Sequence, residues 1–357
     1  MSAGGSFGSI TGRVLALARE LLSLPTAPYH EHEVRAAVEA RLQKLSLRPQ
    51  RDKAGNVMVR CPPGSRSRCP LVLMAHMDHP GFEVVGPQRL EFLGHVPREM
   101  FRGARVRIDG VERPVRVKKV LRQLTHGWLV ETVEDSLPVG AMGVWDLPTV
   151  RARGGQMRAR GIDDVLGVVV VLAVLEEAVR RRLRGPVWGL LTRAEEVGFH
   201  GAALAAQNGE LPRDAVVISI EMSRERPWAR CGQGPVVRVG DRLTVFDRDV
   251  VWYLGEVARR EKISVQRTLM DGGTCEASAL AAWGYRVGGV CMPLRCYHNI
   301  GRGQRPAMES VAIADLLGLV RLLVAAVKHW PPAQHEMTGW RERVQQAVRM
   351  APRQLSG

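Results

Sequence analysis

The sequence LVLMAHMDHPGF, residues 71–82, decides how this chain folds. Residues 71–75 are all apolar, and a short run without polar interruption is typical of a strand buried inside a parallel sheet. The run ends in His76, which places an imidazole at the carboxyl end of the predicted strand. Beyond Phe82 the pattern changes, so this strand is also the last element before a different kind of segment.

The segments on both sides of the strand have the pattern of an α/β sheet. Residues 10–24 and 31–45 carry apolar side chains at helical spacing ahead of it. After Gly161, helical and strand patterns alternate, beginning with a helix over 164–180 and a strand over 186–192. This alternation predicts a sheet covered by helices.

The intervening residues have a different texture. They form short alternating segments, such as 105–108, 115–120 and 128–133, separated by glycine and proline. Such segments are typical of short strands joined by turns. A small β-rich domain is therefore predicted between two parts of the α/β sheet.

The charge of the chain suggests a nucleic-acid partner only at first sight. Its formal value is +15, and clustered cations neutralise phosphates. The arginines are scattered along the sequence, however, and only residues 180–182 form a block, at a predicted helix end where cations offset the helix dipole. We therefore expect no nucleic-acid partner.

The sequence also bears on location. The longest apolar run, residues 165–175, is shorter than the roughly 20 residues that a membrane-spanning helix needs. The first apolar stretch is broken by Arg19 and Glu20, unlike a secretory signal. The six cysteines include no C-x-x-C pair, which argues against a disulfide framework or a zinc knuckle. We expect a cytoplasmic protein with no membrane partner.

Acidic residues and histidines follow several predicted strands. His76 and Asp78 come after residues 71–75, Glu195 and Glu196 follow the strand that ends near residue 192, and Glu221 follows another apolar strand. Ligands of open α/β sheets bind outside the carboxyl ends of strands. These side chains should therefore converge on one crevice.

Each signal is weak by itself. Asp163 and Asp164 precede an apolar helix and could serve as its N-cap, and a lone histidine such as His298 is usually a satisfied polar residue. Glutamate pairs are usually solvated. Together, the two imidazoles and three carboxylates make a ligand set that suits zinc, manganese or cobalt, with one carboxylate bridging two metals.

At this point the sequence resembles the tetrahedral (glutamyl or deblocking) aminopeptidase family of co-catalytic dinuclear metallopeptidases. Six fragments carry the resemblance in order and span nearly the whole chain except its tail. They are AHMDHPGF at 75–82, GIDD at 161–164, AEEVGFHGA at 194–202, ISIE at 218–221, DGGT at 271–274 and PLRCYH at 293–298.

The resemblance implies a role for each site residue. Asp163 would bridge two divalent metal ions, zinc in the first place and cobalt or manganese as alternatives. The other ligands would be His76 and Glu221 on one ion, and Glu196 and His298 on the second.

Two further residues receive roles from the family pattern. Glu195 would be the general base, and Asp78 would hydrogen-bond the imidazole of His76. This sequence departs from the family at four positions. His79 stands in place of an acidic residue, Glu221 and Cys275 each in place of an aspartate, and Cys296 in place of a tyrosine.

The position of the extra domain separates this family from its relatives. There are 87 positions from His76 to Asp163, enough for an inserted domain, and only 77 from Glu221 to His298, where the aminoacylase and carboxypeptidase relatives carry theirs. The aminopeptidase branch is therefore favoured over a deacylase or a carboxypeptidase. A basic binding protein on the same fold is the remaining alternative, and the intact ligands argue against it.

The resemblance also implies an organisation. We expect a three-layer α/β metallopeptidase domain built from residues 1–81 and 157–332, an inserted β-barrel-like domain over 82–156, and a polar tail over 333–357. The insert would serve oligomer contacts and access to the site. The implied function is release of N-terminal residues from peptide substrates by a homo-oligomer, a dimer or a multiple of dimers.

Overall fold

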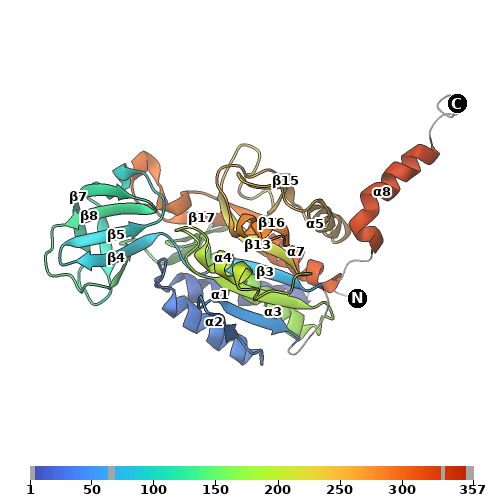
Figure 1. The fold of residues 1–357 in the computed structure, drawn as a ribbon, viewed down its shortest axis with the longest axis horizontal. Helices are drawn as coiled ribbons and strands as arrows, with labels where there is room; N and C mark the ends of the chain where they lie inside the picture. The colour runs from blue at the N-terminus through green and yellow to red at the C-terminus, as the bar shows by residue number, and fades with distance from the viewer. Residues whose placement is uncertain (1–4, 63–68, 331–333, 351–357) are drawn as a thin grey trace.

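The computed structural model describes residues 5–62, 69–330 and 334–350. A β-rich part lies at one end of the molecule, a larger part of helices and strands forms the body, and one helix near the C-terminus projects from the other end (Figure 1). The predicted α/β fold with a β-rich insertion is confirmed.

A mixed sheet of eight strands forms the centre of the body. Its order is β1 (Gln50–Arg51), β2 (Val57–Cys61), β12 (Val187–Thr192), β3 (Leu71–His76), β13 (Val216–Arg224), β16 (Arg286–Leu294), β14 (Val236–Arg238) and β15 (Gln266–Thr268). The strand predicted from residues 71–75 is β3, and it runs parallel to both of its neighbours, β12 and β13. All six of its residues are buried, as expected of a strand with both faces covered.

Helices cover the two faces of this sheet. One layer contains α1 (Gly5–Leu22), α2 (His32–Lys44), α3 (Val165–Arg180) and α7 (Ile313–Lys328), with α5 (Arg248–Arg260) packed against α7. The other contains α4 (His200–Gln207) and α6 (Glu276–Ala282), which pack on each other while α6 contacts β13 and β16. The sheet and the two helical layers on its faces make up the predicted three-layer arrangement.

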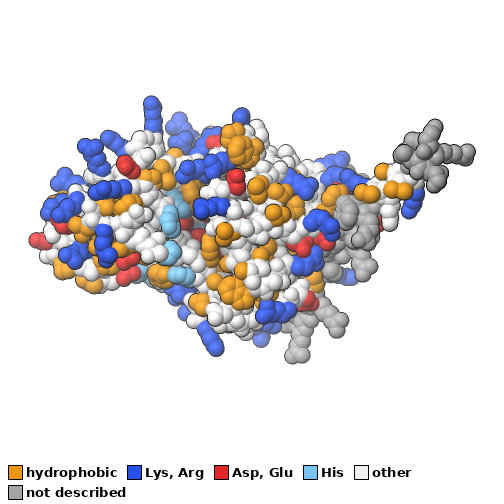
Figure 2. All heavy atoms as spheres, turned by 45° about the horizontal axis from the view of Figure 1, so that its top comes forward, with side chains coloured by type: hydrophobic (Ala, Val, Ile, Leu, Met, Phe, Trp, Pro, Cys, Tyr) orange, Lys and Arg blue, Asp and Glu red, His pale blue; other side chains and the backbone are white. Residues whose placement is uncertain are grey.

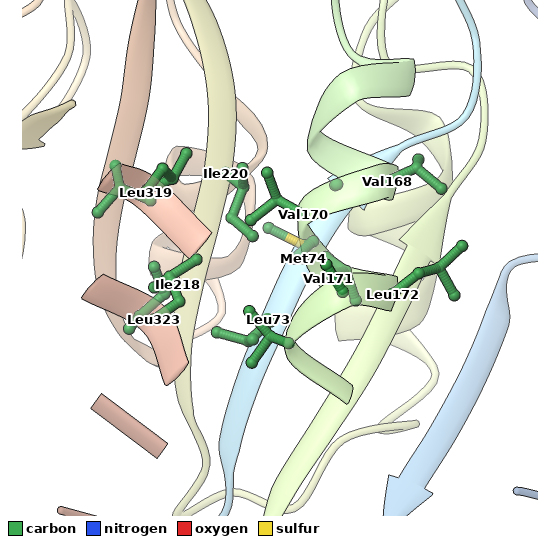
Figure 3. Close-up of a cluster of buried hydrophobic side chains, with 14 of the residues drawn as sticks. Leu73, Met74, Val168, Val170, Val171, Leu172, Ile218, Ile220, Leu319 and Leu323 are labelled. Atoms are coloured by element: carbon green, nitrogen blue, oxygen red, sulfur yellow. The ribbon is translucent and has the colours of Figure 1, made fainter. Parts of the chain in front are cut away.

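From Val165 to Leu175, helix α3 is apolar on every side, and its neighbours enclose this part. Val170 and Val171 belong to one buried cluster with side chains of β3 and β13, among them Leu73, Met74 and Ile220 (Figure 3). A helix that is hydrophobic all round is a buried one. Its β-branched valines are poor helix formers, so tertiary packing rather than propensity stabilises the helix.

The inserted residues form a closed six-stranded barrel. Its order is β4 (Gly81–Gly86), β5 (Arg89–Leu93), β8 (Gly127–Thr132), β7 (Val115–Leu124), β6 (Arg105–Ile108) and β9 (Met142–Trp145). The short helix η1 (Arg98–Phe101) packs on it. The core is aromatic: the ring centroid of Phe82 lies 4.9 Å from that of Phe92 and 4.7 Å from that of Trp145, both nearly edge to face.

Three strands join the two parts. β10 (Val150–Arg153) pairs with β11 (Gln156–Ala159), and β11 pairs with β17 (Glu309–Ala312), which leads directly into α7. Residues 150–156, which the sequence places in the insert, are thus hydrogen-bonded outside the barrel. The division of the chain at residue 156 stays a prediction.

Part of the predicted polar tail is helical. Helix α8 (Gln334–Arg349) is the projecting helix of Figure 1. Arg343 Nη2 donates to Glu256 Oε1 at 3.1 Å, and the guanidinium lies 5.0 Å from the ring centroid of Trp252. Met350 ends the last described range, and the other tail residues, 333 and 351–357, lie outside the described ranges. None of the helices in those ranges is long and apolar enough to cross a membrane.

Candidate metal centre

The carboxyl ends of three parallel strands bring the predicted site residues together. His76 is the last residue of β3, opposite Thr192 at the end of β12. Glu221 lies in β13, and the Glu195–Glu196 pair occupies the turn that leads from β12 to α4. The expected convergence at this edge of the sheet is what the structure has.

The remaining two ligand candidates come from connections. Asp163 stands just before α3, and His298 lies in the short helix η2 (Tyr297–Asn299) after β16. All of these side chains are buried or nearly so. Five residues predicted as ligands, separated by up to 222 positions, therefore lie around one site.

Asp163 lies at the middle of this arrangement. Its Oδ1 is 3.7 Å from His76 Nε2, and its Oδ2 is 3.5 Å from His298 Nε2. Ligand atoms of His76, Asp163 and Glu221 all lie within 4.8 Å of one another, and so do those of Asp163, Glu196 and His298. Asp163 thus belongs to both of these groups, and a third group of the same kind joins His76, Glu195 and Glu196.

The unpaired atoms of the site fit cations. Among the described residues, Asp163 Oδ1 and Glu196 Oε1 are buried and have no hydrogen-bond partner. A buried polar atom left without a partner is costly, and native proteins leave few of them. Imidazole nitrogens and carboxylate oxygens without thiolate are ligands of zinc, cobalt and manganese. The residues present therefore fit two divalent metal ions.

The pKa shifts of the site residues also indicate that the site lacks positive charge. Burial raises the pKa of Glu221 to about 7. Burial, with the nearby carboxylates of Glu196 and Glu221, also holds the pKa of Glu195 well above its usual value against the opposing effect of His76. Burial opposes the charge of Asp163 too, but the imidazoles of His298 and His76 beside it keep its pKa below the usual range. Bound cations would relieve the repulsion among these carboxylates.

Asp78 connects the imidazole to the glutamate turn. Its Oδ1 accepts from the backbone N–H of Glu195 and its Oδ2 from that of Glu196, both at 3.1 Å. The same Oδ1 lies 3.5 Å from His76 Nδ1, which is closer to the backbone oxygen of Asp78, at 3.2 Å. Asp78 therefore fixes the turn with both oxygens and adds a charge beside His76.

Asp164 is not the N-cap that the local sequence allows. It precedes α3, but its side chain makes no capping hydrogen bond, and its Oδ2 faces the backbone N–H of His76 at 3.3 Å. Gly167, one turn into the helix, leaves room for this carboxylate, since a Cβ at Gly167 would collide with it. The helix starts here without a side-chain cap.

The cleft contains residues that the sequence did not single out. Arg238 of β14 is 3% exposed and lines the cleft beside Glu221, and its Nε has no partner among the described residues. Glu276, the first residue of α6, is fully buried, and burial raises its pKa to about 8. Arg238 is one of many arginines in the sequence, whereas Glu276 could have been noticed as an acid directly after D-G-G-T-C.

The departures from the family pattern lie around the ligands. His79 contacts the backbone carbonyl of Asp163 through Nδ1 and lies 2.9 Å from Asn299 Oδ1 through Nε2. The buried Cys275 donates its thiol to Asp241 Oδ2 at 3.4 Å. Cys296 is half-buried and precedes η2. The predicted ligand set is not displaced by any of them.

Histidines also gather outside the ligand set. Figure 2 shows histidine side chains along the hollow between the barrel and the body. Exposed His126, from the hairpin of β7 and β8, has its ring centroid 6.0 Å from that of His95 and 6.4 Å from that of His200. The backbone oxygen of His95 lies 3.1 Å from His298 Nδ1, so the barrel reaches the site directly.

The fold is that of the TET aminopeptidases. A TET aminopeptidase from Thaumarchaeota archaeon SCGC AB-539-E09 matches with a TM-score of 0.77 at 19% identity, over 92% of this chain and 99% of the other. The TET1 peptidase of Pyrococcus horikoshii, which can assemble into a tetrahedron or a large octahedral shell, matches with a TM-score of 0.74 at 21% identity, over 88% of this chain and 99% of the other.

Sequence comparison then gives the family. A protein of Acetivibrio thermocellus named "Putative aminopeptidase" is 24% identical over 322 residues, 84% of this chain and 93% of that protein. The model of the M42 glutamyl aminopeptidase family matches residues 130–312, and the chain belongs to that family. It is therefore a peptidase, of a metallopeptidase family that implies divalent metal ions, and the resemblance found in the sequence is confirmed.

Proposed function

We propose that this chain is an aminopeptidase that releases N-terminal residues from peptides and works with two divalent metal ions, zinc in the first place and cobalt or manganese as alternatives. The observation that supports the proposal best is the position of Asp163. Its two oxygens face two different imidazoles, and it is shared by two groups of three potential ligands. A bridging carboxylate is what a pair of neighbouring cations requires.

The five ligand residues would be divided between the two ions. His76, Asp163 and Glu221 would hold one, and Asp163, Glu196 and His298 the other. When bound, such a pair supplies Lewis-acid polarisation of the scissile carbonyl and lowers the pKa of a water between the ions.

Glu195 is the proposed general base. Its carboxylate lines the cleft, and its Oε2 is 3.9 Å from His76 Nε2, so it lies beside the ligands. It would accept the proton of the attacking water at Oε2 and deliver it to the nitrogen of the leaving amine. Asp78 holds the backbone of this residue in place.

Several features extend the proposal beyond the site. The barrel interrupts the chain between His76 and Asp163, which favours an aminopeptidase over a deacylase or a carboxypeptidase. The TET relatives are described as dodecameric or shell-forming, so we propose a homo-oligomer here, a dimer or a multiple of dimers, with contacts from the barrel. A cytoplasmic location and the absence of a nucleic-acid partner stay predictions.

One experiment tests the function directly. The purified full-length chain, loaded with zinc, cobalt or manganese, is assayed on a panel of amino-acid anilides and, in parallel, on N-acyl amino acids, with its metal content measured. We expect two equivalents of metal and turnover of the anilides alone. Turnover of the N-acyl compounds alone would replace the aminopeptidase by a deacylase.

A further inference from the structure

A buried carboxylate lies next to the ligands and is not among the residues that line the cleft. Glu309, the first residue of β17, has no exposed surface. Its Oε2 accepts from the backbone N–H groups of Ile162, at 2.7 Å, and Asp163, at 3.0 Å. Its Oε1 accepts from the backbone N–H of His298, at 2.8 Å. The Glu309 side chain thus holds the main chain of two candidate ligands, Asp163 and His298, which come from different segments.

A second connection between the same segments runs through His79. The Nδ1 of His79 contacts the backbone carbonyl of Asp163, and its Nε2 lies 2.9 Å from Asn299 Oδ1. Asn299 follows His298 directly, and its amide donates to the backbone oxygen of Arg160 at 2.7 Å. The contacts therefore close a ring, with Glu309 on one side and His79 on the other.

The conformation of His298 shows why this ring matters. Its φ is 53°, and that of Asn299 is 61°, in the left-handed region that side chains with a Cβ rarely adopt. Residues held in such conformations persist only where the surroundings determine them. The Glu309 carboxylate supplies the hydrogen bond to the N–H of His298, and a charged acceptor forms a strong one.

We propose that Glu309 is a positioning residue that sets the spacing between Asp163 and His298, and so the affinity of the metal position made by Asp163, Glu196 and His298. The other position is less dependent on it, because its own ligands His76 and Glu221 are held by the ladders of β3 and β13. This inference rests on the proposed function, since it needs two metal positions.

The test uses metal affinity rather than activity. Metal-free full-length protein is titrated with Zn²⁺ against a chromophoric chelator, which resolves two stepwise constants. In Glu309→Gln the side-chain amide nitrogen must face backbone N–H groups, so at least one hydrogen bond is lost. We expect one constant to weaken by roughly 10–100-fold, the usual scale for groups that orient metal ligands, and the other to stay nearly unchanged.

Asp315→Asn is the matched control. Asp315 is also buried and accepts from two backbone N–H groups, those of Gly232 at 2.7 Å and Gly234 at 2.8 Å, but it contacts none of the ligands. A general effect of removing a buried carboxylate should lower the stability of both variants, whereas only Glu309→Gln should lower metal affinity.

Two additions keep the test decisive. If Glu309→Gln does not fold, His79→Leu cuts the ring from its other side and should show the same selective loss. In Glu309→Gln, equal weakening of both zinc constants, or no weakening of either constant, overturns the positioning role of Glu309. If that variant does not fold, the same two outcomes in His79→Leu overturn it. If the wild-type protein binds fewer than two equivalents of zinc, the proposed function itself is contradicted, whatever the variants show.

Discussion

The Oε2 atom of Glu195 lies 3.9 Å from Nε2 of His76, while the neighbouring Glu196 points its Oε2 to within 3.2 Å of His298 Nε2. Two consecutive glutamates thus face different imidazoles. We predict that Glu195→Gln keeps the metals and loses kcat by at least about 10²–10⁴-fold, because the amide keeps the shape but cannot accept a proton.

Glu196→Gln is the matched control for that prediction. It should lose metal, since it removes a charge from the group with Asp163 and His298. Metal content and kcat measured on both variants decide between the roles. Loss of metal in Glu195→Gln with retention in Glu196→Gln would mean that the two residues have exchanged roles.

Asp163→Asn should lower bound metal and activity together. The carboxylate serves two groups of ligands, and a neutral amide cannot supply the charge that two cations share. Metal analysis after gel filtration measures the effect. Two full equivalents in this variant would contradict the bridging role.

Asp78→Asn should weaken metal affinity or activity by roughly 10–100-fold, as expected of a group that orients a metal-bound imidazole. Both oxygens of Asp78 accept backbone N–H groups of the glutamate turn, so an amide nitrogen in place of one oxygen would also disturb Glu195 or Glu196. We therefore expect both the metal affinity, measured by chelator competition, and kcat to fall. A wild-type profile in both would leave Asp78 without a role in the site.

The raised pKa of Glu276 predicts that the stability of the metal-free protein depends on pH. Burial raises its pKa from 4.5 to about 8, so between these values the folded state binds the proton that the unfolded state releases. The folded state then has more bound protons, and the free energy of unfolding falls as the pH rises. Most of this loss, on the order of a few kcal/mol, should occur between about pH 5 and pH 8.

Glu276→Gln removes this titration. Urea unfolding of metal-free wild type and variant at pH 5 and pH 8 should show a smaller loss of stability in the variant. Equal losses in the two proteins would assign the pH dependence to other groups.

The ligands could be predicted from the sequence because their signal is local. An apolar run that ends in a histidine or an acid places that side chain at the edge of the sheet, as with His76 and Glu221. The family pattern then supplied Asp163 and His298, whose local contexts are ambiguous. The structure brings these residues together, whereas their individual roles stay predictions.

The supporting residues could not be predicted in this way. Glu309 begins a short strand, and its three hydrogen bonds reach residues 11, 146 and 147 positions away, which no local pattern encodes. Arg238 lies in a strand of three residues among many other arginines. Helix α8 was not predicted because polar and charged residues dominate its sequence, and the apolar residues at helical spacing, Trp340, Val344 and Val348, are few.

Removal of the barrel tests its part in both assembly and the site. Phe82 of β4 pairs with Gly143 of β9, so the two ends of the barrel segment lie side by side and a short linker can replace residues 83–144. We expect a folded catalytic part that no longer forms the wild-type assembly, as measured by light scattering.

The same deletion removes the backbone oxygen of His95, which lies 3.1 Å from His298 Nδ1. Because a partner on this nitrogen fixes the ring and its tautomer, the deletion should also weaken one of the two metal constants, by roughly 10-fold or more. An unchanged mass in solution would place the subunit contacts on the catalytic part. Unchanged metal constants would show that the catalytic part alone orients His298.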